Sequence, residues 1–256
     1  MMPSFPNSPA RRATLMLLAA SAVLPSLASA AGPGWGYAAV ASPEHWQHLA
    51  PSCAAGPDSR QSPVDIPRAL VAATPKHPLT FHYGPSLFDA ENNGHAIELE
   101  PRGTDQYITM DGERFVLKQF HMHTPTEHHV DGAPHAMELH LVHANGAGAL
   151  AVVGVFFDVG EENPQLRELL DKAPFALRRK DDDLTLKRPL DLTALLPTAS
   201  PIAQYVGSLT TPPCTEGVHW NVFLTPLTIS SEQLEALQGL HVLNARPLQP
   251  ANGRWK

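Results

Sequence analysis

Charged residues are scarce in this chain, and basic residues are the scarcer kind. Only 17% of the 256 residues are charged, and the formal net charge is −7. Without a basic surplus the chain has little attraction for nucleic acid or an anionic membrane, so neither is expected as a partner. With 43% hydrophobic residues, the composition also excludes a disordered chain and indicates one globular domain with a sizeable core.

The chain also lacks an apolar run long enough for a retained membrane helix. Its longest N-terminal run, Ala13 to Leu27, is interrupted by Pro25. Arg11-Arg12 precedes this run and Ala28-Ser29-Ala30 follows it, an order that predicts a signal peptide of residues 1–30 cleaved after Ala30. Residues 31–256 are then the mature domain, periplasmic or secreted and free of the membrane. The arginine pair leaves both the Sec and the twin-arginine routes open.

Cysteine is almost absent, with only Cys53 and Cys214. Because an exported chain enters an oxidising compartment, we expect these two residues to form a disulfide. The alternative is a pair of buried, unpaired thiols.

Proline is frequent, with 26 residues, and short apolar segments alternate between the turns. This pattern predicts strands near residues 95–100, 107–109, 115–123, 136–143, 150–157 and 218–224. Helices are few. Asn163-Pro164 predicts the start of one that ends near Lys172, and Ser230 with Gln233 forms a capping box for another that ends near Gly239. The charged run of residues 178–183 is interpreted as a solvated loop.

Histidine is concentrated in one region, where residues 121–143 hold seven of the fourteen. Strict alternation in 115–123 predicts one strand face that carries Phe115, Leu117, Gln119, His121 and His123. The same alternation in 136–143 predicts a face made of Glu138, His140 and Val142. If the two strands are neighbours, three imidazoles converge on one point.

Three neutral imidazoles form a catalytic zinc set, because the fourth tetrahedral position stays open for water. A metal-bound imidazole normally donates its other N–H to an acceptor. Gln119 and Glu138 are suitable acceptors, since each precedes a histidine by two residues on the same face. The alternative is that these histidines are exposed or singly hydrogen-bonded.

Several motifs in one order along the mature chain resemble the α-class carbonic anhydrases of the exported bacterial type. They are GYAAVASPEHW from Gly36, RQSPVDI from Arg60, NNGHAIEL from Asn92, QFHMH from Gln119, ELHLVH from Glu138, SLTTPP from Ser208, VHWNV from Val218 and NARPLQP from Asn244. The resemblance implies a β-rich α+β fold, a single domain built on a large, mostly antiparallel, twisted central sheet with a few short peripheral helices. It also implies zinc-dependent, reversible hydration of CO2 to bicarbonate and a proton.

The resemblance assigns the residues around the metal. The zinc ligands would be His121, His123 and His140. Their other ring nitrogens would be served by Gln119, Glu138 and a backbone carbonyl near Asn244. Thr210 would accept a hydrogen bond from the zinc-bound hydroxide that attacks CO2, and would donate a hydrogen bond of its own to Glu127. An ionised glutamate can only accept, so it obliges the threonine hydroxyl to donate to it.

Other positions match the pocket and the proton path. The pocket would be formed by Val142, Val152, Leu209, Thr211 and Trp220, although ordinary core packing also explains the apolar members. His95 matches the proton shuttle, since an imidazole titrates near neutral pH. Tyr37, Asn93 and Thr211 match residues that order the water chain. The alternative for His95 is an ordinary histidine in the loop that follows Asn92-Asn93-Gly94.

Three local features complete the comparison with the family. Met122 stands where an aromatic residue is common, and it should point to the sheet face away from the metal. Glu98 stands where an amide is common in animal members, and its charge is expected to affect anion affinity or the pKa of His95. Ser62-Pro63 and Pro212-Pro213 match positions of cis peptide bonds.

The resemblance also implies that sulfonamides and small anions inhibit the protein, and exported bacterial members are often homodimers. Two other functions compete with this interpretation. A cupin metal site would use His121, His123 and Glu127, but the glycines of that motif are replaced by Phe115 and Pro134. A zinc-buffering protein of the periplasm would not need an apolar wall or a Thr-Glu relay.

Overall fold

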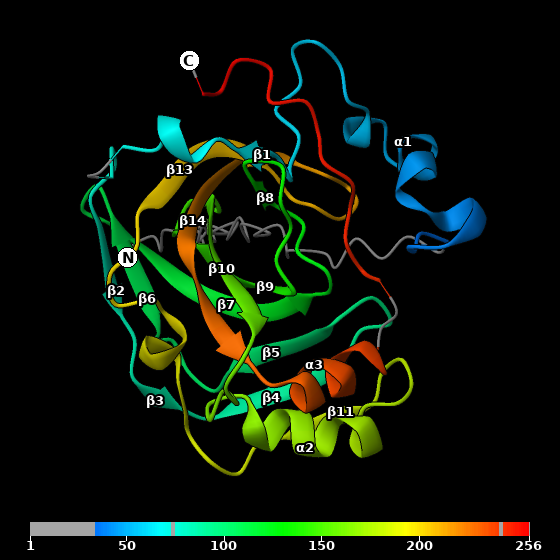
Figure 1. Ribbon diagram of the computed structural model, residues 1–256, viewed down its shortest axis with the longest axis vertical. Helices are drawn as coiled ribbons and strands as arrows, with labels where there is room; N and C mark the ends of the chain where they lie inside the picture. The colour runs from blue at the N-terminus through cyan, green and yellow to red at the C-terminus, as the bar shows by residue number, and fades with distance from the viewer. Residues whose placement is uncertain (1–33, 73–74, 241–242, 256) are drawn as a thin grey trace, which may run out of the picture. The chain divides into compact units, whose positions relative to one another are not determined.

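The computed structural model describes residues 34–72, 75–240 and 243–255, so the predicted signal peptide lies outside the described residues. The large sheet has ten strands (Figure 1). They are β2 (Leu79–His82), β4 (Phe88–Asn92), β5 (Ile97–Pro101), β6 (Tyr107–Met110), β7 (Glu113–His123), β9 (Met137–Ala144), β10 (Leu150–Val159), β11 (Asp183–Thr185), β13 (Ile202–Ser208) and β14 (Glu216–Ile229).

Smaller elements surround this sheet. Two two-stranded sheets pair β1 (Asp65–Ile66) with β8 (His129–Val130) and β3 (Pro85–Ser86) with β12 (Leu190–Asp191). The α-helices are α1 (Trp46–Leu49), α2 (Arg167–Ala176) and α3 (Ser231–Gln238). Short 3-10 turns span Ala39–Ala41, Pro43–His45, Pro51–Cys53, Arg68–Leu70 and Leu192–Leu195.

The order of the large sheet is β11-β4-β5-β7-β9-β10-β14-β13, with β6 pairing both β7 and β2. Within it, every neighbouring pair is antiparallel except β10 and β14, which run parallel. The predicted class, a mostly antiparallel sheet with few short helices, is confirmed.

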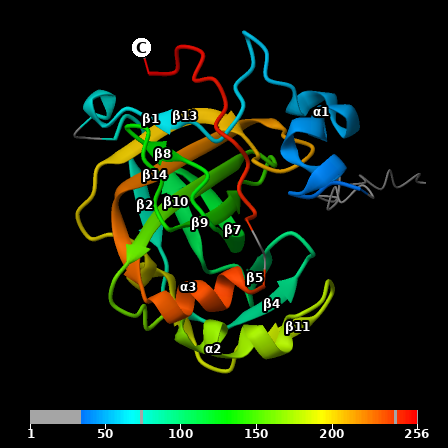
Figure 2. The ribbon, with the colours of Figure 1, turned by 45° about the vertical axis from the view of Figure 1, so that its right-hand side comes forward.

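Apolar side chains cover both faces of the sheet, which explains why β9 and β10 are buried along almost their whole length. One face packs against α2 and α3 through Leu169, Leu170 and Leu237, and the two helices lie side by side below the sheet in Figures 1 and 2. The other face carries a second apolar cluster that includes Val152 and Trp220. The predicted metal ligands and the predicted apolar wall lie on this second face.

The prediction of a single alternating face along residues 115–123 is wrong. The pairing of β7 with β9 shifts between Leu117 and Gln119, where two residues of β7 match one step of β9. This β-bulge inverts the facing of every later side chain. Phe115 and Leu117 therefore join the helix-covered core, whereas Gln119 and both histidines face the other way.

The structure also corrects the first predicted helix. The side-chain oxygen of Asn163 accepts a hydrogen bond from the N–H of Gln165, but it forms a turn and not a cap. The helix begins only at Arg167 and continues through Pro174 to Ala176. The second prediction is confirmed, because Ser230 and Gln233 form a reciprocal capping box at the start of α3.

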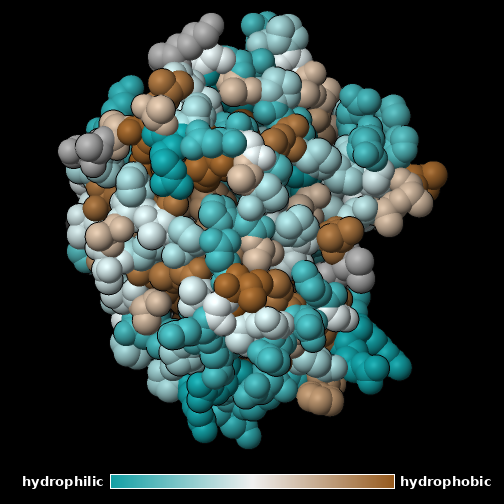
Figure 3. Space-filling view, in the orientation of Figure 1, coloured by the Kyte–Doolittle hydropathy of each residue, from teal (hydrophilic) through white to brown (hydrophobic). Residues whose placement is uncertain are grey.

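Cys53 and Cys214 form the expected disulfide. The two expected cis peptide bonds are present, and Thr124-Pro125 is a third that the sequence analysis did not anticipate. Among the described residues no helix is long and apolar enough to cross a membrane. On the face shown in Figure 3, apolar residues form separate small patches among hydrophilic ones.

Candidate active site

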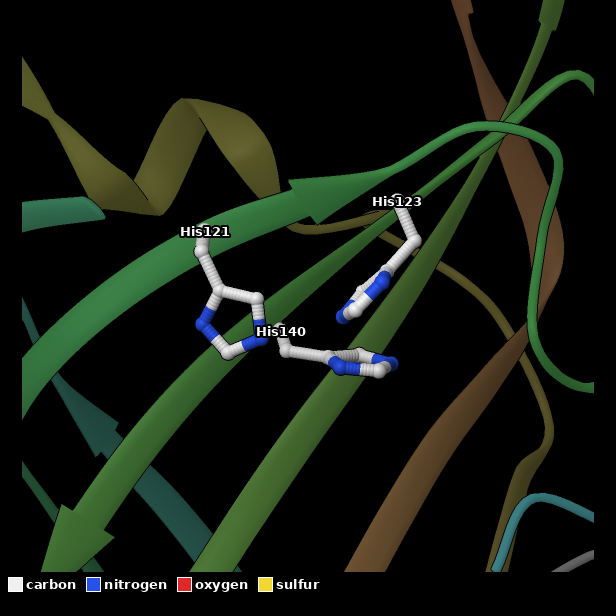
Figure 4. Close-up of side chains that lie close together, drawn as sticks. All are labelled: His121, His123 and His140. Atoms are coloured by element: carbon white, nitrogen blue, oxygen red, sulfur yellow. The ribbon is translucent and has the colours of Figure 1, made fainter. Parts of the chain in front are cut away.

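Three imidazoles converge on the sheet face opposite the helices (Figure 4). His121 of β7 pairs directly with His140 of β9, and His123 is the next residue on the same face of β7. Each residue offers one ring nitrogen, and these three atoms lie within 4.8 Å of one another. Directly opposed side chains on neighbouring strands are close in any antiparallel sheet. The convergence predicted from alternation is therefore present in the fold.

The second nitrogen of each ring already has a partner. His121 Nδ1 lies 2.8 Å from Gln119 Oε1, His123 Nδ1 lies 2.6 Å from the Asn244 carbonyl oxygen, and His140 Nε2 lies 2.9 Å from Glu138 Oε1. These acceptors select the tautomers in which the other nitrogens carry free lone pairs. The remaining nitrogens are Nε2 of His121, Nε2 of His123 and Nδ1 of His140.

Burial supports the neutral form of two of these rings. Burial lowers the pKa of His121 well below its usual value, and the neighbouring histidines lower it further. Burial likewise lowers the pKa of His123, although the charge of Glu127 opposes the shift. For His140, burial lowers the pKa but the charge and hydrogen bond of Glu138 outweigh it, so the net pKa is raised. A metal ligand must be neutral, so burial prepares the first two rings for coordination.

Glu138 is fully buried and serves more than one residue. Its Oε1 contacts His128 Nδ1 at 2.7 Å as well as His140, and its Oε2 accepts the N–H groups of Glu127 and His128. Gly154 of β10 lies opposite His140, and a Cβ there would come within 3.2 Å of Glu138 Oε1. Glycine at this position therefore leaves room for the carboxylate.

Glu127 lies beside the imidazoles and is also buried. Its Oε1 accepts the backbone N–H of Arg246 at 2.8 Å. Its Oε2 lies 3.5 Å from His123 Nε2, and within the described chain neither of these two atoms has a hydrogen-bond partner. A carboxylate oxygen and a ring nitrogen without partners in a buried site indicate that each is available to a further group, such as a hydrogen-bond donor for the oxygen and a metal ion for the nitrogen.

The predicted pocket residues lie next to these polar groups. Val142, Val152 and Trp220 are matched across β9, β10 and β14, and Leu209 packs against the same apolar cluster. The Trp220 ring lies edge-on to His140, with 4.8 Å between ring centroids. Thr210 is 5% exposed and follows Leu209, and the carbonyl of Thr211 accepts the N–H of Cys214 at 2.8 Å. An apolar wall thus adjoins the imidazoles.

His95 lies in the turn between β4 and β5, half-buried and stacked on Trp35 with 3.6 Å between ring centroids. Asn93 Oδ1 accepts the N–H groups of His95 and Ala96, so its side chain holds the turn together. Burial lowers the pKa of His95, and the charge of Lys180 lowers it further. A neutral, partly accessible imidazole results.

Tyr37 lies near this turn, half-buried, edge-on to Trp35 and Trp46. Burial and then the charge of Glu127 raise its pKa well above the usual range, so it keeps its phenolic proton.

Two residues that sequence reasoning left without a role support the site from behind. His128 bridges Glu138 to the Tyr205 hydroxyl, with 2.6 Å between His128 Nε2 and that oxygen. The guanidinium of Arg246 is buried and donates to the backbone carbonyls of Cys53 and Ser62. The backbone N–H of Arg246 donates to the Glu127 carboxylate. Only the tertiary structure identifies these contacts, because the partners lie far apart in sequence.

Comparisons with known proteins agree with this geometry. The eukaryotic-type carbonic anhydrase family matches residues 41–255. A carbonic anhydrase of Klebsiella pneumoniae is 42% identical over 225 residues, which cover 86% of this chain and 89% of that relative. A carbonic anhydrase of Pectobacterium atrosepticum is 38% identical over 224 residues, which cover 86% and 88%.

Solved structures give the same result. The α-carbonic anhydrase of Thermovibrio ammonificans, in complex with sulfanilamide, superimposes with a TM-score of 0.80 at 40% identity and covers 87% of this chain and 98% of that chain. The chain therefore belongs to the eukaryotic-type carbonic anhydrase family, whose reaction is the reversible hydration of carbon dioxide.

Proposed function

We propose that the protein hydrates CO2 reversibly with a zinc ion held by His121, His123 and His140. The observation that carries the proposal is the set of three converging nitrogens, each on a ring whose other nitrogen already has an acceptor. His123 Nε2 is buried without a partner in the described chain, which fits a metal ligand better than a packing role. When bound, zinc supplies a Lewis acid that makes water nucleophilic near neutral pH, an effect for which carbonic anhydrases are the standard example.

Thr210 and Glu127 would orient the nucleophile. Glu127 Oε1 is engaged by the Arg246 N–H, and its Oε2 is available as an acceptor. A hydroxyl that donates to this oxygen must present its lone pairs to the pocket, so Thr210 would accept a hydrogen bond from the nucleophile. This arrangement directs the attacking lone pair toward the substrate.

The apolar wall would hold the substrate. Carbon dioxide has no net charge and only weak acceptors, so contact with Val142, Val152, Leu209 and Trp220 is the suitable mode of binding. Bicarbonate is charged and is disfavoured against the same surface. The wall therefore favours substrate entry and product release, with Thr211 at its polar edge.

His95 would carry the proton out. Its imidazole is half-buried and titrates below its usual pKa, so it accepts a proton transiently and passes it to buffer. Asn93 keeps the turn of His95 in place, and Tyr37, which keeps its proton, would order water between this turn and Glu127.

The disulfide supports an oxidising compartment, and with the sequence pattern of residues 1–30 we propose export to the periplasm or the medium. The structural relative from Thermovibrio ammonificans was solved with sulfanilamide. We therefore propose that sulfonamides and small anions also bind this chain at the three histidines.

The test is stopped-flow CO2 hydration by the purified mature chain, with zinc content measured on the same sample. We expect rapid hydration with one zinc per chain, and loss of both in His123→Ala. His129→Ala is the matched control, because His129 lies in β8 away from the convergent nitrogens. Bound zinc without hydration above the buffer rate would refute the proposal and favour a zinc-binding protein.

A further inference from the structure

A second pocket lies at the edge of the large sheet that β13 forms, and its lining includes Tyr205 and Trp220 as well as residues of the face opposite the candidate active site. On β14, Trp220 faces the active site, so His219 and Asn221 point to the reverse face. There β13 pairs with β14. The segment before β2 contacts β13, because the backbone N–H of His77 donates to the side-chain oxygen of Gln204 at 2.8 Å. Figure 1 shows β13, β6 and β2 on the same side of the molecule. The pocket is partly open and has a volume of about 190 Å³.

The lining of this pocket is cationic on an acidic protein. It includes Arg60, Lys76, His77, His219 and Arg254, and no carboxylate is among the lining residues. In the described chain, Arg60, Lys76 and Arg254 form no salt bridge, whereas Arg102 and Arg167 do. The Arg254 guanidinium donates only to backbone carbonyls.

Two acids beside the pocket already have hydrogen-bond partners. Asp111 lies 2.7 Å from His77 Nδ1, and Glu216 accepts the N–H of Arg60 and the amide of Gln61. Burial lowers the pKa of Arg254, and the charge of Arg60 adds to that shift. The like charges of Arg60 and Arg254 therefore meet at the pocket and Glu216 offsets them only in part, an arrangement that an anion would relieve further.

A buried donor completes the pocket. Asn221 is 1% exposed, and its side-chain oxygen is held by Gln204 Nε2 at 2.8 Å. Its amide nitrogen has only long contacts, 3.4 Å to the His219 carbonyl and 4.0 Å to the Met110 sulfur. A buried N–H group with such weak acceptors is available to a better one.

We propose that this pocket binds a small oxyanion of the class of phosphate or bicarbonate. The volume lies below the roughly 300–1,000 Å³ of pockets for drug-sized ligands, so an ion with a few waters fits it best. Arg60 and Lys76 supply the mobile charges, and the amide of Asn221 supplies the donor at the base. None of the three histidines lines the pocket, although Trp220 borders both sites, and the proposal does not rest on the hydration activity.

The test is NMR titration of the zinc-loaded protein, labelled with 15N, at constant ionic strength set with sodium chloride. Inorganic phosphate at pH 7 and bicarbonate at pH 8 are added in separate arms. We expect a saturable shift of the Asn221 and Gln204 side-chain amides in at least one arm. Arg60→Gln with Lys76→Gln should weaken that binding about tenfold or more, because two charge-assisted contacts are lost.

Lys118→Gln is the matched control, because it removes an exposed cation of β7 that does not line the pocket. Its dissociation constant should equal that of the wild type. The proposal would be overturned if neither amide showed a saturable shift with phosphate or with bicarbonate up to about 100 mM anion. Weakening of anion binding by Lys118→Gln to the same extent would also overturn it, because the effect would then come from the net charge of the protein and not from this pocket.

Discussion

Glu98 of β5 lies directly opposite His121 of β7. Its Oε2 accepts the side-chain N–H of Asn93 at 3.1 Å, so the carboxylate also braces the turn that carries His95. Burial raises the pKa of Glu98, and the charges of Glu100 and Glu91 add to the rise. The Glu98 carboxylate thus lies beside His121, at the site where inhibitory anions would bind.

Glu98→Gln should strengthen inhibition by thiocyanate about fivefold. A like charge at ~8 Å costs about 1 kcal/mol at an effective dielectric of ~40, between the values for bulk water and a protein surface. The amide keeps an acceptor for Asn93 but removes this repulsion. The inhibition constant is measured in the hydration assay. Glu91→Gln, at the exposed position opposite Glu98 on β4, should have a smaller effect; equal inhibition constants for all three proteins would contradict the assignment.

Thr210→Ala should lower kcat about 10²–10³-fold while zinc stays bound, because one orienting hydrogen bond to the reacting group is lost. Thr210→Ser keeps the hydroxyl and should recover most of the activity. Stopped-flow kinetics and metal analysis are measured on the same preparations. Loss of zinc from Thr210→Ala would place this residue among the metal supports and not in the relay.

The buried His143 should make the protein less stable in weak acid. Its Nδ1 donates to the Ala151 carbonyl, its Nε2 accepts the Tyr83 hydroxyl at 2.7 Å, and burial lowers its pKa to about 3. Below about pH 6.5 this histidine binds a proton in the unfolded chain but not in the folded chain. Stability is therefore complete above that pH and declines as the pH falls toward 3, by about 2 kcal/mol at pH 5.

Urea unfolding at pH 7 and pH 5 measures this decline. His143→Gln is expected to be less stable at both pH values. Its free energy of unfolding should fall between pH 7 and pH 5 by about 2 kcal/mol less than that of the wild type. His45→Gln, which changes an exposed histidine, should show the wild-type difference. If His143→Gln also shows the wild-type difference, another group is responsible.

Replacing both cysteines with serine should cost up to about 5 kcal/mol, because the disulfide closes a loop between residues 161 apart. Cys214 donates its N–H to Thr211, so turnover should fall more than zinc content. Urea unfolding and the hydration assay are compared with the wild type under oxidising conditions. Unchanged stability in the double variant would show that the bridge adds nothing to the fold.

Local pattern was sufficient to predict that the three imidazoles converge. The spacing of His121 and His123 and the alternation of Glu138 and His140 are properties of single strands, so they can be read without knowing the fold. The capping box at Ser230 and Gln233 is local in the same way. The facing of Phe115 and Leu117 was mispredicted, because a bulge depends on how β9 pairs with β7 and leaves no mark in the alternation itself.

The sequence by itself therefore determined the residue types at the site, their acceptors within two residues, and the family. The tertiary structure decided which strands are neighbours, and with that every contact between distant residues. Arg246 reaches Glu127 across 119 positions, and His128 reaches Tyr205 across 77. The pocket behind Trp220 has the same origin, because its cations converge only after β13, β14 and the segment before β2 pack together. Such contacts depend on strand order and chain packing, which no local periodicity encodes.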